Sequence, residues 1–342
     1  MTKLAVALGV RSPKLDAPMR EFFRDARPWG FILFREACVS KEQVTALCQD
    51  LRDAVGHDAV IYIDQEGGPV ARLKAPEWPV WPAAAKYGEL YRKDHAHGLA
   101  AARLGYRLIA HELKSMGVDG DYAPVLDTPV DGADPIIGDR AFSRDGDVIA
   151  ELGRAALSGL ADGGVVGCIK HLPGHGRAEA DSHLHLPRVK ASADELEIDI
   201  APFKALCDAP AAMTAHIVYE AWDPQRPATC SKKVISEIIR GEIGFDGLLK
   251  TDDLDMKAMA PIGDLRERAE AALKAGCDMV LQCSGDLEEM KLVVQGCAKL
   301  DGRALDRAKA VEAIAKHKPV SFDVEESWAR FNALMDETAK PA

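Results

Sequence analysis

Long hydrophobic runs are missing from this chain of 342 residues. A helix that spans a membrane needs about 18 or more consecutive apolar residues, and no stretch of the sequence approaches that length. The apolar run nearest the N-terminus covers only residues 4–10 and is ended by Arg11. We therefore interpret this run as a short buried strand rather than a signal peptide, and we expect no association with a membrane.

Closely paired cysteines are missing as well. The eight cysteines are scattered, and none of them forms a C-x-x-C pair. A disulfide framework or a zinc ribbon is expected to show such regular, close spacing. The pattern therefore predicts reduced thiols and a cytoplasmic protein.

Basic residues are in the minority. The chain has 43 Lys and Arg residues against 54 Asp and Glu residues, which gives a formal net charge of −11. Nucleic acids and anionic lipids are bound through basic surfaces, so the charge argues against either as the main partner. With 47% hydrophobic and 28% charged residues, the composition is that of a soluble globular protein.

Short apolar runs alternate with helical patterns along the chain. Eight runs have the length of buried strands: 4–10, 30–34, 59–64, 118–127, 165–171, 211–217, 247–253 and 278–283. Helical patterns lie at 40–55, 95–117, 147–164, 192–208, 231–244 and 264–277. Strands that alternate with helices form a parallel sheet, and eight such units predict an α/β fold with a closed (β/α)8 barrel of the TIM type. An open doubly wound sheet is the alternative, but no glycine-rich dinucleotide motif follows any strand.

No linker composition interrupts the chain, so we predict a single catalytic domain over residues 1–342. The segment 301–342 contains two more helical stretches. We expect them to form a C-terminal helical extension that packs against the barrel.

Polar residues gather where the expected strands end. Five of the eight strands end in such residues, namely Asp64, Gln65, Glu66, Asp121, Asp127, Lys170, His171, His216, Asp252 and Asp253. In (β/α)8 barrels the C-terminal strand ends carry the chemistry. Buried charges are costly unless they are paired or used. The pattern therefore predicts an enzyme or a protein that binds a polar ligand.

The stretch CIKHLPGHGRAEADSHLH, residues 168–185, concentrates titratable groups in one loop. It contains His171, His175, His183 and His185. Imidazoles at these spacings, with Asp181, could bind zinc, and a solvated loop could have the same composition. We favour a catalytic loop, in which Asp181 orients the imidazole of His183 for proton exchange with a substrate. His175, which lies between two glycines, is expected to shape the turn by hydrogen bonding, and His185 to be exposed.

Four further residues suit the chemistry of a sugar ring. Asp252 stands at the end of its strand, where a carboxylate can attack an anomeric carbon. A helix N-cap is the alternative role, but it fits the residues after Asp252 better. Asp64 and Arg72 lie eight residues apart and offer an acceptor and a donor for vicinal hydroxyls, and the alternative is an ion pair that shapes the loop. Arg140 follows the fourth strand, and its alternative is an ordinary surface position.

Four motifs together resemble glycoside hydrolase family three. KHLPGHG with DSH (170–176 and 181–183), IDQEGG (63–68), TDDLDM (251–256) and GDRAFSRD (138–145) occur in the order of the family's motifs. The combination resembles bacterial β-N-acetylglucosaminidases that act in the cytoplasm during peptidoglycan recycling. It implies a (β/α)8 barrel without the second domain of many relatives.

The resemblance also implies the roles of individual residues. It identifies Asp252 as the nucleophile of a retaining exo-hydrolase, His183 as the acid/base and Asp181 as its partner. Substrate-binding positions fall on Asp64, Arg72, Arg140, Lys170 and His171. The implied substrate is N-acetylglucosaminyl-1,6-anhydro-N-acetylmuramic acid with or without peptide. No metal, organic cofactor or obligate protein partner is implied.

Three residues depart from the family pattern. Pro69 stands where the family usually has arginine, Thr251 replaces a serine, and Lys250 occupies a position that is usually apolar. If strand alternation holds, Lys250 and Asp252 face the same way. Lys250 could then lower the pKa of Asp252, or it could pair with Asp253.

Other functions remain open from the sequence. A phosphorylase on the same scaffold is one, because a histidine acid/base does not repel incoming phosphate as a carboxylate would. A zinc hydrolase built on the histidines is a second. A sugar-binding protein without turnover is a third, although it would not need both Asp252 and His183.

Overall fold

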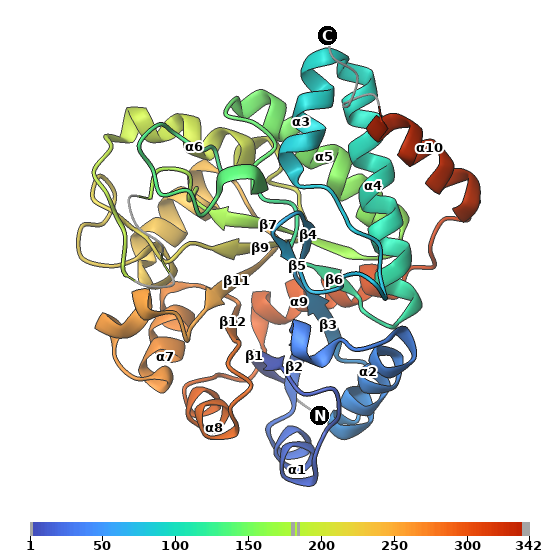
Figure 1. Cartoon of the computed structure of the whole chain (residues 1–342). Helices are drawn as coiled ribbons and strands as arrows, with labels where there is room; N and C mark the ends of the chain where they lie inside the picture. Colours follow the sequence, from blue (N-terminus) through green and yellow to red (C-terminus); the bar gives the residue numbers. More distant parts are fainter. Residues whose placement is uncertain (1–2, 179–181, 183–184, 337–342) are drawn as a thin grey trace.

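Eight parallel strands form a closed barrel in a computed structural model of the chain, which describes residues 3–178, 182 and 185–336 (Figure 1). The barrel strands are β1 (Leu4–Val10), β2 (Pro28–Leu33), β3 (Val60–Ile63), β6 (Gly120–Asp121), β7 (Val166–Leu172), β9 (Ala211–Thr214), β11 (Leu248–Asp253) and β12 (Met279–Gln282). Neighbours around the barrel follow the order β1-β12-β11-β9-β7-β6-β3-β2. The predicted fold class is confirmed, and each expected strand overlaps one barrel strand.

The fourth strand is shorter than its apolar run. Residues 118–127 read as one strand in the sequence, but β6 covers only two of them. Pro124 has no N–H group to donate to a neighbouring strand, which interrupts the ladder. Pairing resumes at Val125, which forms a parallel bridge with Lys170 of β7.

Helices surround the barrel. They are α1 (Ala17–Ala26), α2 (Lys41–Val55), α3 (Ala84–Lys93), α4 (His95–Ser115), α5 (Gly146–Asp162), α6 (Ala193–Ala205), α7 (Leu265–Ala275), α8 (Leu287–Gln295), α9 (Gly302–Ala315) and α10 (Val324–Asp336), together with the π-helix η4 (Val234–Glu242). The predicted helical patterns correspond to α2, α4, α5, α6, η4 and α7, whereas α1, α3 and α8 were not predicted. No helix in the part of the chain that the structure describes is long and apolar enough to cross a membrane.

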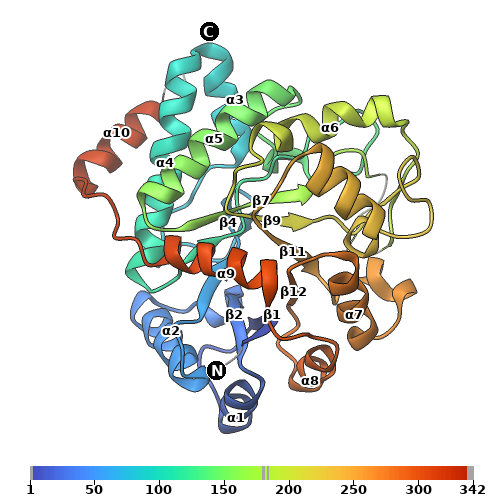
Figure 2. The same cartoon turned by 180° about the vertical axis from the view of Figure 1, so that it is seen from behind.

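Two layers of core hold the strands. Along each strand, alternate side chains enter either the barrel interior or the shell between barrel and helices. The interior contains the rings of Trp29, Tyr62 and Tyr122. It also includes apolar residues of α9, which lies across the N-terminal end of the barrel (Figure 2). Trp29 anchors this helix, because its Nε1 donates to Oε1 of Glu312 at 2.7 Å.

The last helix, α10, lies against the outside of α4. The rings of Trp328 and Phe331 pack on Trp81, with the two indole centroids 5.0 Å apart. The C-terminal helices thus contact the barrel at two places, its N-terminal end and its outer shell. Neither contact obstructs the C-terminal strand ends.

Candidate active site

One cavity at the C-terminal strand ends brings most of the predicted site residues together. It measures about 510 Å³, and its lining includes Asp64, Arg72, Arg140, Lys170, His171 and Asp252. Strand alternation explains the convergence. Asp64, Lys170 and Asp252 each lie two residues beyond an interior residue, namely Tyr62, Cys168 and Lys250, so they form the uppermost layer of the barrel interior. His183 and Asp181 lie outside the described residues.

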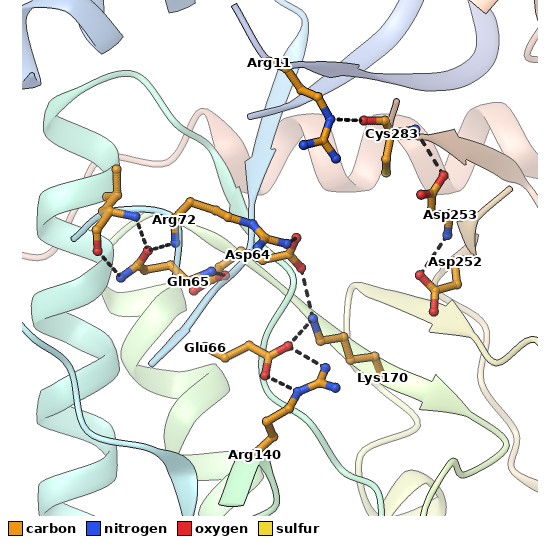
Figure 3. A network of polar contacts seen from close by, with 12 residues as sticks. Arg11, Asp64, Gln65, Glu66, Arg72, Arg140, Lys170, Asp252, Asp253 and Cys283 are labelled. Carbon is orange, nitrogen blue, oxygen red and sulfur yellow. Dashed lines mark hydrogen bonds and ion pairs between the residues drawn. The ribbon is translucent and has the colours of Figure 1, made fainter. Parts of the chain in front are cut away.

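A buried network of charges covers one side of the cavity (Figure 3). Arg72 Nη2 lies 2.8 Å from Oδ2 of Asp64, and Lys170 Nζ lies 3.1 Å from Oδ1 of the same carboxylate. Lys170 Nζ also lies 2.6 Å from Glu66. Arg140 approaches Glu66 with Nε and Nη2 at 2.8 and 2.9 Å, a bidentate contact. Three cations and two carboxylates thus hold one another in fixed positions.

The charges of this network keep both carboxylates ionised. Burial raises the pKa of Glu66, but Arg140 and Lys170 outweigh this effect and hold that pKa at about 2. Burial likewise raises the pKa of Asp64, yet Lys170 and Arg72 bring it below its usual value. Ionised carboxylates only accept hydrogen bonds, so Asp64 is an acceptor for ligand hydroxyl groups.

Glu66 is a site residue that the sequence analysis did not assign. Glu66 stands at an expected strand end, but nothing in the sequence indicates that it lies beside Lys170 and Arg140. Glu66 is 4% exposed and contacts both residues, which come from β7 and from the short helix η2 (Gly138–Arg140). Its burial between two cations could not be inferred without the fold.

Asp127 orients His171 and is the second residue without an assigned role. It is fully buried, and its Oδ2 lies 2.7 Å from Nδ1 of His171. Oδ1 accepts the backbone N–H groups of His171 and His175 at 3.1 and 2.6 Å. Burial raises the pKa of Asp127, but the neighbouring histidines lower it below its usual value. Because ionised Asp127 can only accept, His171 carries a proton on Nδ1 and leaves Nε2 for a ligand.

His175 forms a hydrogen bond within the stretch 168–185, as the sequence predicts. Its Nε2 lies 3.1 Å from the hydroxyl of Ser182. Burial lowers the pKa of His175 to about 4, so its ring is neutral at neutral pH. His185 is exposed, also as predicted. Within residues 3–178, 182 and 185–336, no three His, Cys, Asp or Glu residues are grouped to hold a metal ion.

The geometry distinguishes Asp252 from Asp253. Oδ1 of Asp253 accepts the backbone N–H groups of Asp255 and Cys283 at 3.0 and 3.1 Å. This carboxyl group therefore connects the end of β11 to the residue that follows β12. Burial and the nearby charge of Asp255 raise the pKa of Asp253. Both aspartates line the cavity, but Asp252 accepts one backbone N–H group in the described part of the chain, that of Asp253 at 2.8 Å. This arrangement favours Asp252 as the nucleophile.

Lys250 does not pair with Asp253, contrary to one of the two predicted roles. Its Nζ lies 3.2 Å from the centre of the Tyr62 ring, 4.9 Å from that of Trp29 and 5.0 Å from that of Tyr122. Lys250 is fully buried, and its Nζ has no hydrogen-bond partner in the described part of the chain. Strand alternation points this side chain down into the aromatic interior, below the cavity.

The other two departures from the family pattern have local explanations. Thr251 faces β12, where its Oγ1 accepts the backbone N–H of Leu281 at 2.9 Å and joins the two strands. Pro69 lines the cavity in the turn between the short strands β4 (Gln65–Gly67) and β5 (Val70–Ala71). Arg72, just after that turn, keeps its place beside Asp64.

The sequence is similar to those of known proteins. The sequence matches the model of the glycosyl hydrolase family 3 N-terminal domain over residues 7–315. A β-hexosaminidase from Bordetella avium is 41% identical over 82% of this chain and 80% of its own length. One from Thioalkalivibrio sulfidiphilus is 39% identical, with the same coverage of 82% and 80%.

Solved structures give the same result. The crystal structure of NagZ from Neisseria gonorrhoeae in complex with N-trifluoroacetyl-D-glucosamine is 32% identical, with a TM-score of 0.86 over 98% of this chain and 99% of that one. A family 3 β-N-acetylglucosaminidase from Paenibacillus is 29% identical with a TM-score of 0.79, and this chain spans 62% of its length. The chain therefore belongs to family 3 of the glycoside hydrolases.

Proposed function

We propose that the protein is a retaining exo-β-N-acetylglucosaminidase of the cytoplasm. Its substrate would be N-acetylglucosaminyl-1,6-anhydro-N-acetylmuramic acid, with or without peptide, from which it removes the terminal N-acetylglucosamine. Relatives named β-hexosaminidase support this proposal, as does the likeness to NagZ, which was crystallised with an N-acylated glucosamine. Eight free cysteines support the reducing compartment.

One observation carries the proposal. The Asp252 carboxylate shares a cavity with a prearranged set of hydroxyl-binding groups on Asp64, Arg72, Lys170 and His171. The cavity volume of about 510 Å³ falls within the range of roughly 300–1,000 Å³ for small-molecule sites. A sugar ring that spans the cavity would place its hydroxyls on the charged network and its anomeric carbon toward Asp252.

The proposed reaction has two steps. A carboxylate oxygen of Asp252 attacks the anomeric carbon, the bond to the aglycone oxygen breaks, and His183 donates a proton to that oxygen. His183 then takes a proton from water, the water oxygen attacks the anomeric carbon, and the Asp252 carboxylate leaves. Two inversions restore the β configuration in the product. In this scheme Asp181 supports the imidazolium form of His183.

The charged network has a binding role in this scheme. Asp64 accepts hydrogen bonds from hydroxyls, Lys170 and Arg72 donate to them, and His171 offers its Nε2 at a neighbouring position. Because Glu66 holds Lys170 and Arg140 in place before substrate arrives, little side-chain ordering is left to occur on binding. Such preorganisation suits a neutral sugar that binds only through hydroxyl and amide groups.

Hydrolysis of p-nitrophenyl β-N-acetylglucosaminide beside the matching β-glucoside tests the proposal. We expect turnover of the first and at most weak turnover of the second. NMR of the first-formed sugar should show the β anomer. The α anomer as first product, or equal turnover of both substrates, would contradict the proposal.

Two controls separate the alternative chemistries. Added phosphate should leave the product unchanged, whereas a sugar 1-phosphate would identify a phosphorylase. A chelator should leave the rate unchanged, because the proposed mechanism uses no metal. Loss of activity that zinc restores would instead identify a metal-dependent hydrolase.

A further inference from the structure

Arg11 follows the end of β1 and contacts two residues of the cavity lining, and the scheme above gives it no role. Its guanidinium carbon lies 4.0 Å from the centre of the Phe34 ring, and its Nε donates to the backbone oxygen of Cys283 at 3.0 Å. Phe34 and Cys283 both line the cavity. Stacking and the hydrogen bond fix the orientation of the guanidinium group, which is directed in Figure 3 toward the region between Asp64 and Asp252.

A chain of contacts connects Arg11 to the nucleophile (Figure 3). Arg11 contacts Cys283, the N–H of Cys283 lies 3.1 Å from Oδ1 of Asp253, and the N–H of Asp253 lies 2.8 Å from Oδ1 of Asp252. Arg11 is therefore on the side of the cavity where the scissile bond would lie.

The charge of Arg11 is poorly compensated. Arg72, Arg140 and Lys170 each contact a carboxylate that is buried or nearly so. The only carboxylate that Arg11 contacts among the described residues is Glu36, at 3.2 Å. The side chain of Glu36 is 61% exposed, so water competes for this ion pair and it contributes little.

A second guanidinium group lies close to Arg11 but is paired with a carboxylate. Arg72 lies 5.1 Å from the centre of the same Phe34 ring that Arg11 covers. Arg72 is held by Asp64, whereas Arg11 donates from Nε to Cys283 and from Nη1 to the exposed Glu36 at 3.2 Å. A ligand carboxylate that displaced Glu36 could bind both Nη groups of this planar guanidinium.

We propose that Arg11 binds the carboxylate that the aglycone carries beside the scissile bond. This inference rests on the proposed function, in which the aglycone is a muramic acid unit. Such a unit bears a lactyl ether, which ends in a carboxylate, on the ring carbon adjacent to the one that carries the leaving oxygen. The contact makes Arg11 a specificity-determining residue, which favours substrates with a free lactyl carboxylate over those in which it forms an amide.

Steady-state kinetics on three substrates tests this inference. They are N-acetylglucosaminyl-1,6-anhydro-N-acetylmuramic acid, the same disaccharide with its lactyl carboxylate converted to an amide, and p-nitrophenyl β-N-acetylglucosaminide. We expect Arg11→Met to raise KM for the acid about three- to tenfold, with kcat nearly unchanged. The amide and the aryl glycoside should respond less than twofold. The methionine keeps apolar contact with Phe34.

Two further variants sharpen the test. Glu36→Gln removes the competing carboxylate, so it should lower KM for the acid and leave the two neutral substrates unchanged. Arg20→Met is the matched control, because the Arg20 side chain is 42% exposed beside 40% for Arg11 and lies on α1. It makes the same change in net charge and should leave all three KM values unchanged.

The outcomes distinguish the inference from the proposed function. Equal effects of Arg11→Met on acid and amide would overturn the role of Arg11, as would an equal effect of Arg20→Met on the acid. If the wild-type protein hydrolysed the aryl glycoside but neither disaccharide, the proposed substrate would be wrong and Arg11 would have no such ligand. Loss of activity on all three substrates in Arg11→Met, repeated in Arg11→Lys, would show that Arg11 supports the fold instead.

Discussion

Neighbouring aspartates at the end of β11 have different tasks, and substitution should separate them. Asp252→Ala should lower kcat on the aryl glycoside by about 10⁴-fold or more, because the nucleophile is needed for any leaving group. Azide should restore part of the rate and give the α-glycosyl azide. Initial rates with and without azide provide the measurement.

Asp253→Asn is the control for that prediction. The asparagine oxygen can still accept the N–H groups of Asp255 and Cys283, so we expect activity within about tenfold of wild type. A reversed pattern, with Asp253→Asn inactive and Asp252→Ala active, would move the nucleophile by one position.

His183 and Asp181 stay predictions from the sequence, and leaving-group dependence is the measurement that checks them. His183→Ala should slow substrates with poor leaving groups most, because those need a proton at the glycosidic oxygen. With a good leaving group the glycosyl-enzyme should accumulate and give a pre-steady-state burst, since the same histidine activates water.

A variant of Asp181 provides the comparison. Asp181→Asn should act like His183→Ala in milder form, because the imidazole remains without its charged partner. Uniform losses in His183→Ala across leaving groups, without a burst, would argue against the acid/base role.

At the level of elements, Asp127 connects the end of β7 to the loop after it, because its carboxylate accepts the N–H groups of both His171 and His175. Asp127→Asn should lower kcat/KM about 10- to 100-fold, because an amide that donates to His171 Nδ1 reverses the tautomer of the ring.

Asp119→Asn is the matched control at the other end of the barrel. Asp119 is another buried aspartate close to β6, and its carboxylate contacts Arg52 and the N–H of Ile61. Both variants should lower the melting temperature, but Asp119→Asn should leave kcat/KM nearly unchanged. Comparable losses of activity in the two would reduce Asp127 to a structural role.

At the scale of the whole molecule, Lys250 weakens the barrel in a way that depends on pH. Burial lowers the pKa of Lys250 from 10.5 to about 7. The unfolded chain therefore binds one more proton than the folded chain between about pH 7 and 10.5, so this group makes stability rise with pH in that window. Below pH 7 this loss of stability is complete, and it lowers the free energy of unfolding by ~3–5 kcal/mol.

Lys250→Met should remove this loss of stability. Methionine has a similar length, and the position faces Trp29, Tyr62 and Tyr122. We expect the variant to exceed wild type in free energy of unfolding by about 2–4 kcal/mol at pH 6, with the difference shrinking toward pH 10. Urea unfolding at several pH values measures this difference. A constant difference, or a less stable variant, would contradict the inferred burial of an uncharged amine.

Much of the architecture was predictable because it is encoded locally. Eight short apolar runs and the helical patterns between them specify the barrel, since each depends only on residues that are contiguous in the chain. Strand alternation then places Asp64, Lys170 and Asp252 at one end of the interior. The helices α1, α3 and α8 escaped prediction because they are short, with 10, 10 and 9 residues, and so few turns give only a weak helical pattern.

The sequence by itself thus determined the barrel, the end of it that carries the site, and the family motifs that mark most of the site residues. Only the tertiary structure decided which polar groups are in contact. Glu66 lies between Lys170 and Arg140, Asp127 contacts His171, and Arg11 donates to the backbone oxygen of Cys283. It also turned Lys250 away from Asp253 and into the aromatic interior. The physical reason is that such contacts join residues from separate strands and loops, and the cost of burying each charge depends on neighbours that only the closed barrel supplies.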